Sequence, residues 1–111
     1  MNTILVAGQH IELDQDGYLL DLADWSEEVA ITLAENEGLS LSAAHQEIIY
    51  ALRQFYLEFQ LSPAMRPLVA YIRQTLGEEK GNSIYLLSLF PGSPAKLASK
   101  IAGLPKPDNC L

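Results

Sequence analysis

The residue in this sequence best suited to covalent chemistry is its only cysteine, Cys110, which stands one residue before the end of the 111-residue chain. Two prolines at alternate positions, Pro105 and Pro107, remove backbone donors and fix φ, so this segment joins neither a helix nor a central strand. Polyproline-type geometry rises about 3.1 Å per residue, so the steps from Ala102 to Cys110 span up to about 25 Å. The sequence therefore predicts a thiol at the tip of a semi-rigid arm formed by residues 103–111.

A thiol in this position is suited to nucleophilic transfer, because the thiolate attacks sulfur and its reactivity depends on access and on thiolate fraction. The arm supplies access. Electrostatic activation is weaker, because Asp108 and the carboxylate of Leu111 flank the thiol, and the nearest cations, Lys106 and Lys100, lie farther along the chain. We therefore expect the pocket of a partner protein to activate Cys110. A second interpretation stays open: chain ends are commonly disordered, and the cysteine is then a residue without function.

The composition is typical of one globular domain in a reducing compartment. A chain of 111 residues, 49% of them hydrophobic, is large enough for a single core. One cysteine cannot form an internal disulfide. Neither a secretory signal nor an apolar run of the roughly 20 residues that a membrane span needs is found. These features predict a cytoplasmic protein without a membrane segment.

Several classes of function are disfavoured. Fourteen acidic against seven basic residues give a net charge of −7, which opposes direct binding to nucleic acid. All basic residues lie between Arg53 and Lys106, so an anionic partner is expected to meet the second half of the chain. Lys96, Lys100 and Lys106 are interpreted as solvated charges, and the alternative is that they guide docking onto an acidic partner. No metal or organic cofactor is expected, because zinc-ligand spacing and glycine-rich phosphate loops are absent from the sequence.

A β-hairpin is predicted at the N-terminus of the body from which the arm extends. Apolar segments at residues 3–6 and 10–13 flank Gly8, which is typical of two strands joined by a tight turn. Residues 14–17 predict a second turn and residues 18–20 a brief third strand. Since an isolated hairpin is only marginally stable, we expect it to pack on helices.

Five helices are predicted after the hairpin. The first begins near Asp24 as its N-cap, carries Trp25 on its apolar face and ends at Gly38. The second is capped by Ser42 and is the expected core helix, because large apolar side chains recur in it at helical spacing. These side chains are Ile48, Ile49, Leu52, Phe55, Tyr56 and Phe59.

The last three helices are bounded by proline, glycine and capping residues. A short turn at 62–65 precedes a helix at 66–76. Asn82 or Ser83 caps a short helix that ends before Pro91, and Ser93-Pro94 starts a helix at 95–102. The second and third helices resemble a helix-turn-helix, but the third offers few of the Arg, Lys, Asn and Gln side chains that read DNA bases.

Several segments resemble the DsrC/TusE family, and together they cover nearly the whole chain. They are Gly77–Ser83, Leu89–Pro91 with Pro94–Lys96, Tyr56–Phe59, Ala34–Gly38, and Ala102–Pro107 followed by Cys110. The tail with its penultimate cysteine is the most specific of them. The resemblance implies a mainly α fold: a small helical bundle with an N-terminal β-hairpin, a winged-helix-like arrangement and a protruding C-terminal arm.

The number of cysteines divides this family. DsrC proteins of dissimilatory sulfur metabolism carry a second cysteine about eleven residues before the penultimate one, and in this sequence Ser99 takes that position. Serine forms no disulfide or trisulfide, so the two-cysteine redox cycle with sulfite reductase is not available. The resemblance to single-cysteine members implies that Cys110 accepts sulfane sulfur as a persulfide from a TusBCD-like donor complex. It then passes the sulfur to an MnmA-like tRNA thiouridylase, so this chain acts on tRNA only indirectly.

The predicted function is thus that of a sulfurtransferase subunit in the relay for tRNA wobble 2-thiouridine. Residues 1–102 form the helical domain, residues 103–111 form the arm, and Cys110 is the one catalytic residue expected. Two alternatives stay open: a non-catalytic, DsrC-like regulator or binding module that uses its helix-turn-helix-like surface on DNA or its arm on an enzyme of sulfur metabolism, and a structural assembly factor. Sulfur uptake by Cys110 separates the first prediction from both.

Overall fold

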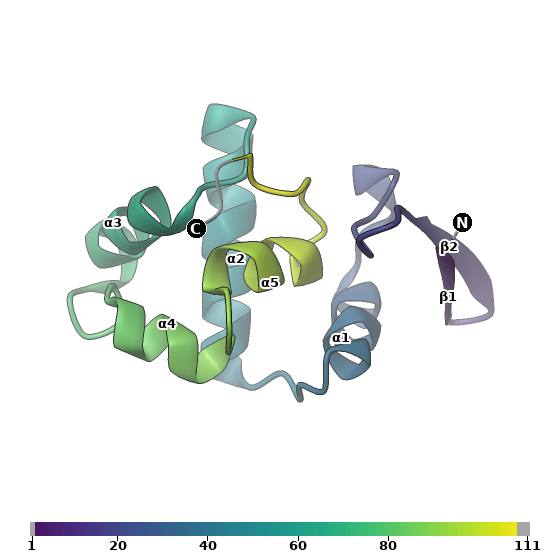
Figure 1. Ribbon diagram of the computed structural model, residues 1–111, viewed down its shortest axis with the longest axis horizontal. Coiled ribbons are helices and arrows are strands. Elements are labelled where there is room, and N and C mark those ends of the chain that lie inside the picture. The colour runs from purple at the N-terminus through teal and green to yellow at the C-terminus, as the bar shows by residue number, and fades with distance from the viewer. Residues whose placement is uncertain (1, 109–111) are drawn as a thin grey trace.

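The computed structural model describes residues 2–108, in which five α-helices follow an N-terminal hairpin (Figure 1). The elements are β1 (Asn2–Val6), β2 (Gln9–Leu13), the 3-10 helix η1 (Leu22–Asp24), α1 (Glu27–Asn36), α2 (Ala43–Phe59), α3 (Met65–Leu76), α4 (Ser83–Leu89) and α5 (Pro94–Ile101). The predicted fold class, a small mainly α bundle with an N-terminal hairpin, is confirmed. Between residues 2 and 108, no helix combines the length and apolar character that a membrane crossing requires.

The hairpin forms around a two-residue turn, as predicted. Ala7 and Gly8 both have positive φ, 49° and 80°, which matches the right-handed twist of the flanking antiparallel strands. Alternate side chains are buried, and the inward face packs on α1. The predicted third strand is reduced to one isolated bridge between Leu13 and Leu19.

The start of the first helix was placed wrongly. Ser26, not Asp24, is the N-cap of α1, and its hydroxyl accepts a hydrogen bond from the Val29 amide. Asp24 instead ends the 3-10 turn η1, which Asp21 caps. Trp25 therefore precedes α1 and does not lie on its apolar face. Its backbone is extended there, which frees the indole for contacts with a distant part of the chain.

The second helix agrees with its prediction except at its end. Ser42 caps α2 in a capping box whose returning side chain is His45. Four of the predicted core side chains are buried: Ile48, Ile49, Leu52 and Phe55. Phe59 is half exposed, contrary to its assignment to the core, because it is the last residue of the helix.

The last three helices begin close to the predicted residues. α3 starts at Met65, so Pro67 falls in its first turn, where the missing N–H has no helical partner to lose. The short turn expected at 62–65 therefore does not form as a separate element. Asn82 caps α4, and α5 begins at Pro94, directly after Ser93.

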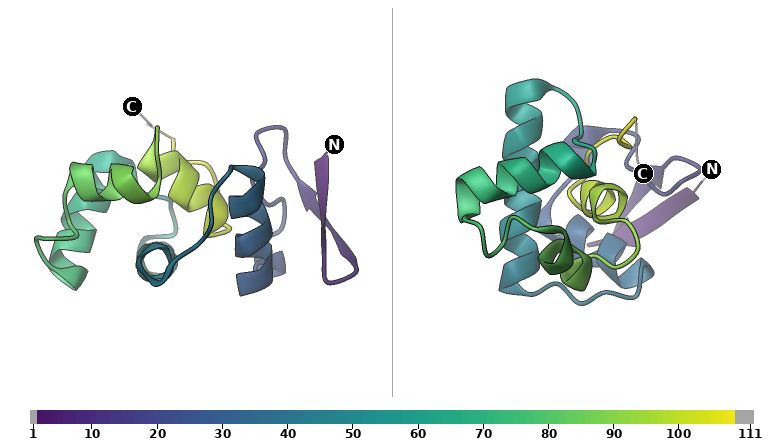
Figure 2. Two further views of the ribbon diagram at one scale, coloured as in Figure 1. Left: turned by 90° about the horizontal axis from the view of Figure 1, so that it is seen from below. Right: turned by 60° about the vertical axis from the view of Figure 1, so that its left-hand side comes forward.

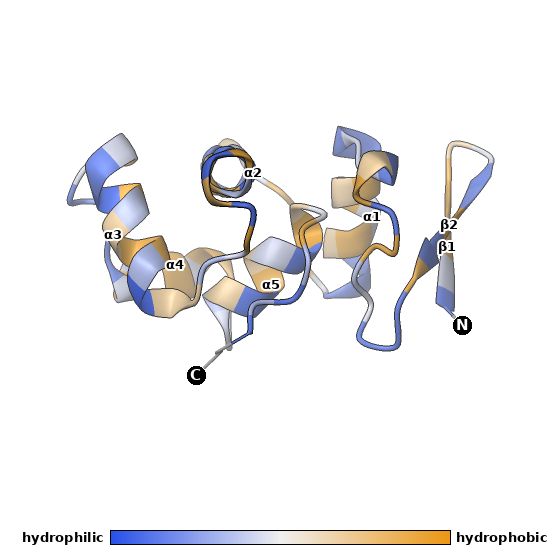
Figure 3. Ribbon diagram, turned by 90° about the horizontal axis from the view of Figure 1, so that it is seen from above, coloured by the Kyte–Doolittle hydropathy of each residue, from blue (hydrophilic) through white to orange (hydrophobic). Residues whose placement is uncertain are grey.

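The short helix α5 occupies the middle of the bundle. It contacts α1, α2, α3 and α4, and the views in Figures 1 and 2 show it enclosed between α2 and the other helices. Small inward residues allow this close approach: Ala95, Ala98 and Ser99 are at most 2% exposed. The hairpin lies at one end of the 40 × 26 × 22 Å molecule and α3 and α4 at the other. Hydrophobic and hydrophilic residues alternate around the helices, as amphipathic packing requires (Figure 3).

The described part of the arm lies on the body. After α5, Gly103, Leu104 and Pro107 are buried, whereas Lys106 and Asp108 are exposed. In Figure 1 this yellow segment runs beside the C-terminal end of α2. The division into a domain at 1–102 and an arm at 103–111 stays a prediction, because it extends beyond residue 108.

Candidate functional site

The predicted catalytic residue, Cys110, lies outside the described residues. The site that the structure does describe is the base of the arm, from the end of α5 to Asp108. The end of α5 is where the chain passes from the packed body towards the thiol. The contacts of this segment therefore determine from which point, and in which direction, the arm begins.

Three side chains from distant parts of the chain hold backbone carbonyls of this segment. The Trp25 Nε1–H donates to the carbonyl of Ile101 at 2.9 Å, and Arg53 Nη1–H donates to the carbonyl of Ala102 at 2.7 Å. The Ser62 hydroxyl donates to the carbonyl of Pro105 at 2.5 Å. We call Trp25, Arg53 and Ser62 the arm anchor. The last carbonyls of a helix have no helical partner, so the first two contacts also close the end of α5.

Arg53 and Trp25 support each other. The guanidinium carbon of Arg53 lies 3.9 Å from the centre of the Trp25 ring, in cation–π contact. The ring of Tyr50, one turn earlier on α2, packs edge-on against the same indole, with 6.1 Å between the ring centres. Its hydroxyl donates a hydrogen bond to the Glu27 carboxylate. Partial burial lowers the pKa of Arg53 from its usual value. Arginine side chains keep their charge in proteins. Arg53 is therefore a fixed cation at the negative end of the α5 dipole.

The backbone turns sharply between two of the anchored carbonyls. Gly103 has a φ of 76°, and a Cβ added there would lie 2.3 Å from Cδ1 of Trp25. Only glycine therefore fits both the conformation and the space. Leu104, the next residue, is 3% exposed and belongs to the core, and its amide donates to the carbonyl of Ser99 at 2.9 Å.

Lys100 and Lys106, two of the three lysines interpreted as solvated charges, form surface ion pairs within the chain. Lys106 lies 3.3 Å from the Asp16 carboxylate, and Lys100 lies 3.3 Å from that of Glu37. The Lys100 ammonium also lies 5.3 Å from the centre of the Tyr18 ring. Exposed pairs of this kind contribute little stability. The Lys106 pair links the arm to the turn at residues 14–17, and the Lys100 pair links α5 to the C-cap of α1.

Ser99, which the resemblance aligns with the second cysteine of two-cysteine proteins, is part of the core. Its side chain is 0% exposed, and its hydroxyl is the one buried side-chain polar atom without a hydrogen-bond partner among residues 2–108. The side chain is therefore shielded from solvent and from any external reagent.

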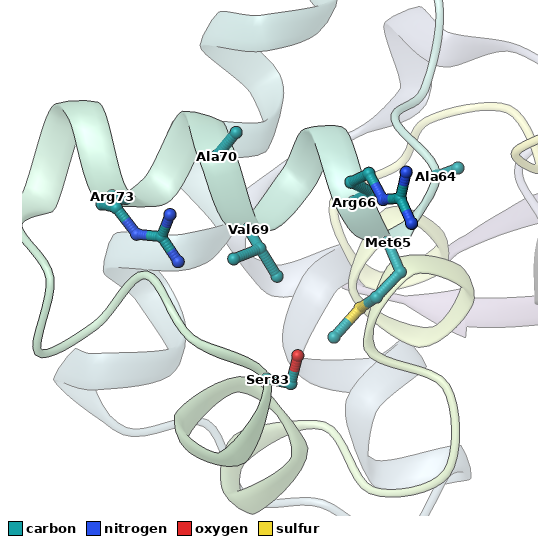
Figure 4. A pocket seen from close by; sticks show the side chains of 7 residues that line it. All are labelled: Ala64, Met65, Arg66, Val69, Ala70, Arg73 and Ser83. Carbon is teal, nitrogen blue, oxygen red and sulfur yellow. The ribbon is translucent and has the colours of Figure 1, made fainter.

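Two neighbouring hollows lie on the surface, and only one of them is lined by the arm. One, of about 420 Å³, is lined by the end of α2, the α2–α3 linker and residues 105–108. The other, of about 570 Å³, lies between α3 and the start of α4, and Ala64 borders both. Figure 4 shows the guanidinium groups of Arg66 and Arg73 over the second hollow, opposite Ser83. Among residues 2–108, no acidic side chain lines this hollow. An anionic partner for the second half of the chain stays a prediction.

The arm anchor was not predicted, because its residues stand far from the arm in sequence. Arg53 and Ala102 are separated by 49 positions, and Trp25 and Ile101 by 76. One signal was available: Arg53 directly follows the core residue Leu52 on a largely apolar helix, and a cation in such a place needs a partner.

Comparisons with known proteins agree with this geometry. The family described as "DsrC like protein" matches residues 5–111. The "Sulfurtransferase TusE" of Escherichia coli strain K12 is 54% identical over 108 residues, which cover 97% of this chain and 99% of that protein. The protein of the same name from Salmonella typhimurium strain LT2 is 52% identical over the same shares of both chains. The resemblance stated from the sequence is confirmed.

Solved structures of similar fold are also DsrC proteins. The solution structure of Allochromatium vinosum DsrC has a TM-score of 0.90 and 47% identity, covering 99% of this chain and 98% of that one. The crystal structure of the oxidized gamma-subunit of the dissimilatory sulfite reductase (DsrC) from Archaeoglobus fulgidus has a TM-score of 0.86 and 36% identity, covering 99% and 100%. The full-length match to TusE proteins confirms the predicted class, a sulfurtransferase. On fold and sequence together, the chain belongs to the DsrC-like protein family.

Proposed function

We propose that this sulfurtransferase carries sulfane sulfur as a persulfide on Cys110 within a cytoplasmic sulfur relay. The observation that carries the proposal is the match to sulfurtransferases named TusE over 97% of the chain, in a family whose matched region runs to residue 111. Because Cys110 is the only cysteine, it is the only thiol through which this chain can accept sulfur.

The transfer step is a thiol–persulfide exchange without net oxidation. The thiolate of Cys110 attacks the terminal sulfur of a donor persulfide, and a new S–S bond forms at Cys110 as the donor's S–S bond breaks. The donor cysteine leaves as a thiolate, which takes up the proton that Cys110 gave up. An acceptor thiolate then attacks the terminal sulfur of the Cys110 persulfide, and Cys110 leaves as a thiolate when its S–S bond breaks. No metal or organic cofactor takes part in either step.

The donor we propose is a TusBCD-like complex, and the acceptor an MnmA-like tRNA thiouridylase that makes wobble 2-thiouridine. This route is the one that the resemblance to single-cysteine family members implies. A two-cysteine cycle needs a second thiol, and the family position for it holds Ser99, whose buried hydroxyl cannot form a sulfur–sulfur bond.

The experiment that tests this function is the 2-thiouridine content of tRNA in cells whose only copy carries Cys110→Ser. We expect the modification to be lost. A matched control is Ser40→Ala, an exposed serine far from the arm in sequence, which should leave the modification at its wild-type level. A normal 2-thiouridine content in the Cys110→Ser cells, with the variant protein present, would show that Cys110 does not serve this relay.

A second candidate function is that of a binding module without sulfur transfer. The exposed Arg66, Arg73 and Gln74 of α3 favour it, because they could meet an anion such as a DNA backbone. Salt-sensitive binding of duplex DNA that Arg66→Gln weakens, together with no sulfur uptake by Cys110, would support this candidate over the relay.

A further inference from the structure

Three donors converge on only five consecutive backbone positions. Trp25 comes from the segment before α1, Arg53 from the middle of α2 and Ser62 from the α2–α3 linker, and all three reach carbonyls between residues 101 and 105. Carbonyls at an exposed helix end can be satisfied by water alone. Such a concentration of long-range contacts therefore does more than satisfy polar groups, because it fixes the path of the chain as it leaves α5.

The segment between these contacts is also fixed by packing. Ala102 is 0% and Leu104 3% exposed, and Gly103 lies against the Trp25 indole with no space for a side chain. Arg53 is itself stacked on Trp25, so the donor to Ala102 and the donor to Ile101 cannot move independently. The chain is held from Ile101 to Pro105 as one unit with the body.

We propose that Arg53, with Trp25 and Ser62, is a positioning residue for sulfur transfer, because it sets the point and direction from which the arm carries Cys110 to a partner. This inference rests on the proposed function. The last carbonyl that the arm anchor holds is that of Pro105, and Cys110 stands five positions farther along the chain. At about 3.3–3.6 Å per residue, the reach from that point is at most about 18 Å. A loosened anchor moves the pivot back towards α5 and spreads the thiol over a larger volume.

Positioning of this kind affects transfer between proteins but not the reactivity of the thiol itself. A misplacement of about 1 Å can lower the rate of a reaction in a bound complex about 100-fold. A small reagent approaches the thiol from any direction and does not depend on where the arm begins. The two kinds of reaction therefore separate a positioning role from a purely structural one.

The test compares Arg53→Gln, Trp25→Phe and Ser62→Ala with the wild-type chain. Lys80→Gln is the matched control, because it also removes a cation that donates a hydrogen bond, to Glu47 at 2.6 Å near the start of α2, whereas the arm lies beside the end of that helix. Arg53→Lys tests rescue, since it keeps the charge and one donor. Circular dichroism first establishes that each variant is folded at the assay temperature.

The first readout needs no partner protein. Nitroxide labels are attached to Cys110 and to Glu28→Cys, an exposed position of α1. Pulsed electron paramagnetic resonance then measures the distribution of distances between the two labels. We expect the distribution to broaden in the three anchor variants, to stay as in the wild type in Lys80→Gln, and to narrow again in Arg53→Lys. A distribution unchanged in all folded anchor variants would overturn the inference.

The second readout is sulfur transfer. Alkylation of Cys110 by iodoacetamide and its loading by inorganic polysulfide should proceed at wild-type rates in every variant. Transfer from a persulfide-loaded donor complex at saturating concentration should fall about 10- to 100-fold in Arg53→Gln and partly recover in Arg53→Lys. Equal transfer rates in Arg53→Gln and Lys80→Gln would also overturn the inference. Failure of the wild-type chain to take sulfur from either source would instead refute the proposed function, while the distance measurement still tests the anchor.

Discussion

Gly103 lies with its backbone directly against the indole of Trp25, close enough that any Cβ at this position would meet Cδ1 of the ring at 2.3 Å. This contact joins the first residue of the arm to the segment that precedes α1. The arm therefore begins from a surface that the N-terminal half of the chain builds, and not from the end of α5 alone.

Gly103→Ala should be strongly destabilising. The positive φ costs an alanine about 1–2 kcal/mol, and the clash with Trp25 adds to that cost, so we expect a loss of about 3–4 kcal/mol in the free energy of unfolding. Gly8→Ala is the matched control, because Gly8 also has a positive φ, but a Cβ added there would have no other atom within 4 Å. Urea denaturation of both variants measures the difference. Equal losses in the two would mean that the Trp25 contact does not constrain the arm.

Ser99→Ala should leave the stability unchanged or increase it. The buried hydroxyl of Ser99 has no hydrogen-bond partner, and an unsatisfied buried polar group costs about 1–3 kcal/mol. Removing the oxygen recovers part of this cost, and the cavity left behind is small. We expect a gain of up to about 1 kcal/mol, measured by urea denaturation, with unchanged sulfur loading of Cys110. A clear loss of stability would show that the hydroxyl makes a favourable interaction in solution.

The ion pair between Lys80 and Glu47 should contribute to stability only below strongly alkaline pH. The Lys80 ammonium donates to Glu47 at 2.6 Å, and this hydrogen bond raises the pKa of Lys80 above 10.5. The folded state thus binds the proton more tightly than the unfolded state. The contribution is fully present below pH 10.5 and is lost as pH rises through the folded pKa. The difference in Tm between the wild type and Glu47→Gln should therefore shrink above pH 10.5.

The control for this pair is Glu35→Gln, an exposed carboxylate on α1. Its difference in Tm from the wild type should not follow the titration of Lys80. A Glu47→Gln difference that persists unchanged well above pH 10.5 would contradict the assignment.

Local signals in the sequence were sufficient for most of the fold. Ser42 and Asn82 cap helices as predicted, because a cap depends on hydrogen bonds within three residues of chain. The choice between Asp24 and Ser26 could not be made locally, since both are good caps. Asp24 ends a 3-10 turn, and Trp25 is held outside α1 by its hydrogen bond to the Ile101 carbonyl. That contact is tertiary and has no pattern in the sequence.

The candidate site divides in the same way. Cys110 was identified from its position and from the family resemblance, and its role remains a proposal. The arm anchor could not be identified, because Arg53 and Ser62 are placed on the arm only by the packing of α2 and its linker against α5. Phe59 was wrongly assigned to the core, because helical spacing does not show where a neighbouring helix stops covering a face.

Intact-protein mass spectrometry tests whether Cys110 holds transferable sulfur. The full chain is incubated with a persulfide-loaded donor complex and analysed without reductant. We predict a mass increase of one sulfur atom that maps to Cys110, disappears on adding dithiothreitol and is absent from Cys110→Ser. A wild-type chain that gains no sulfur while the donor discharges to another acceptor would contradict the account.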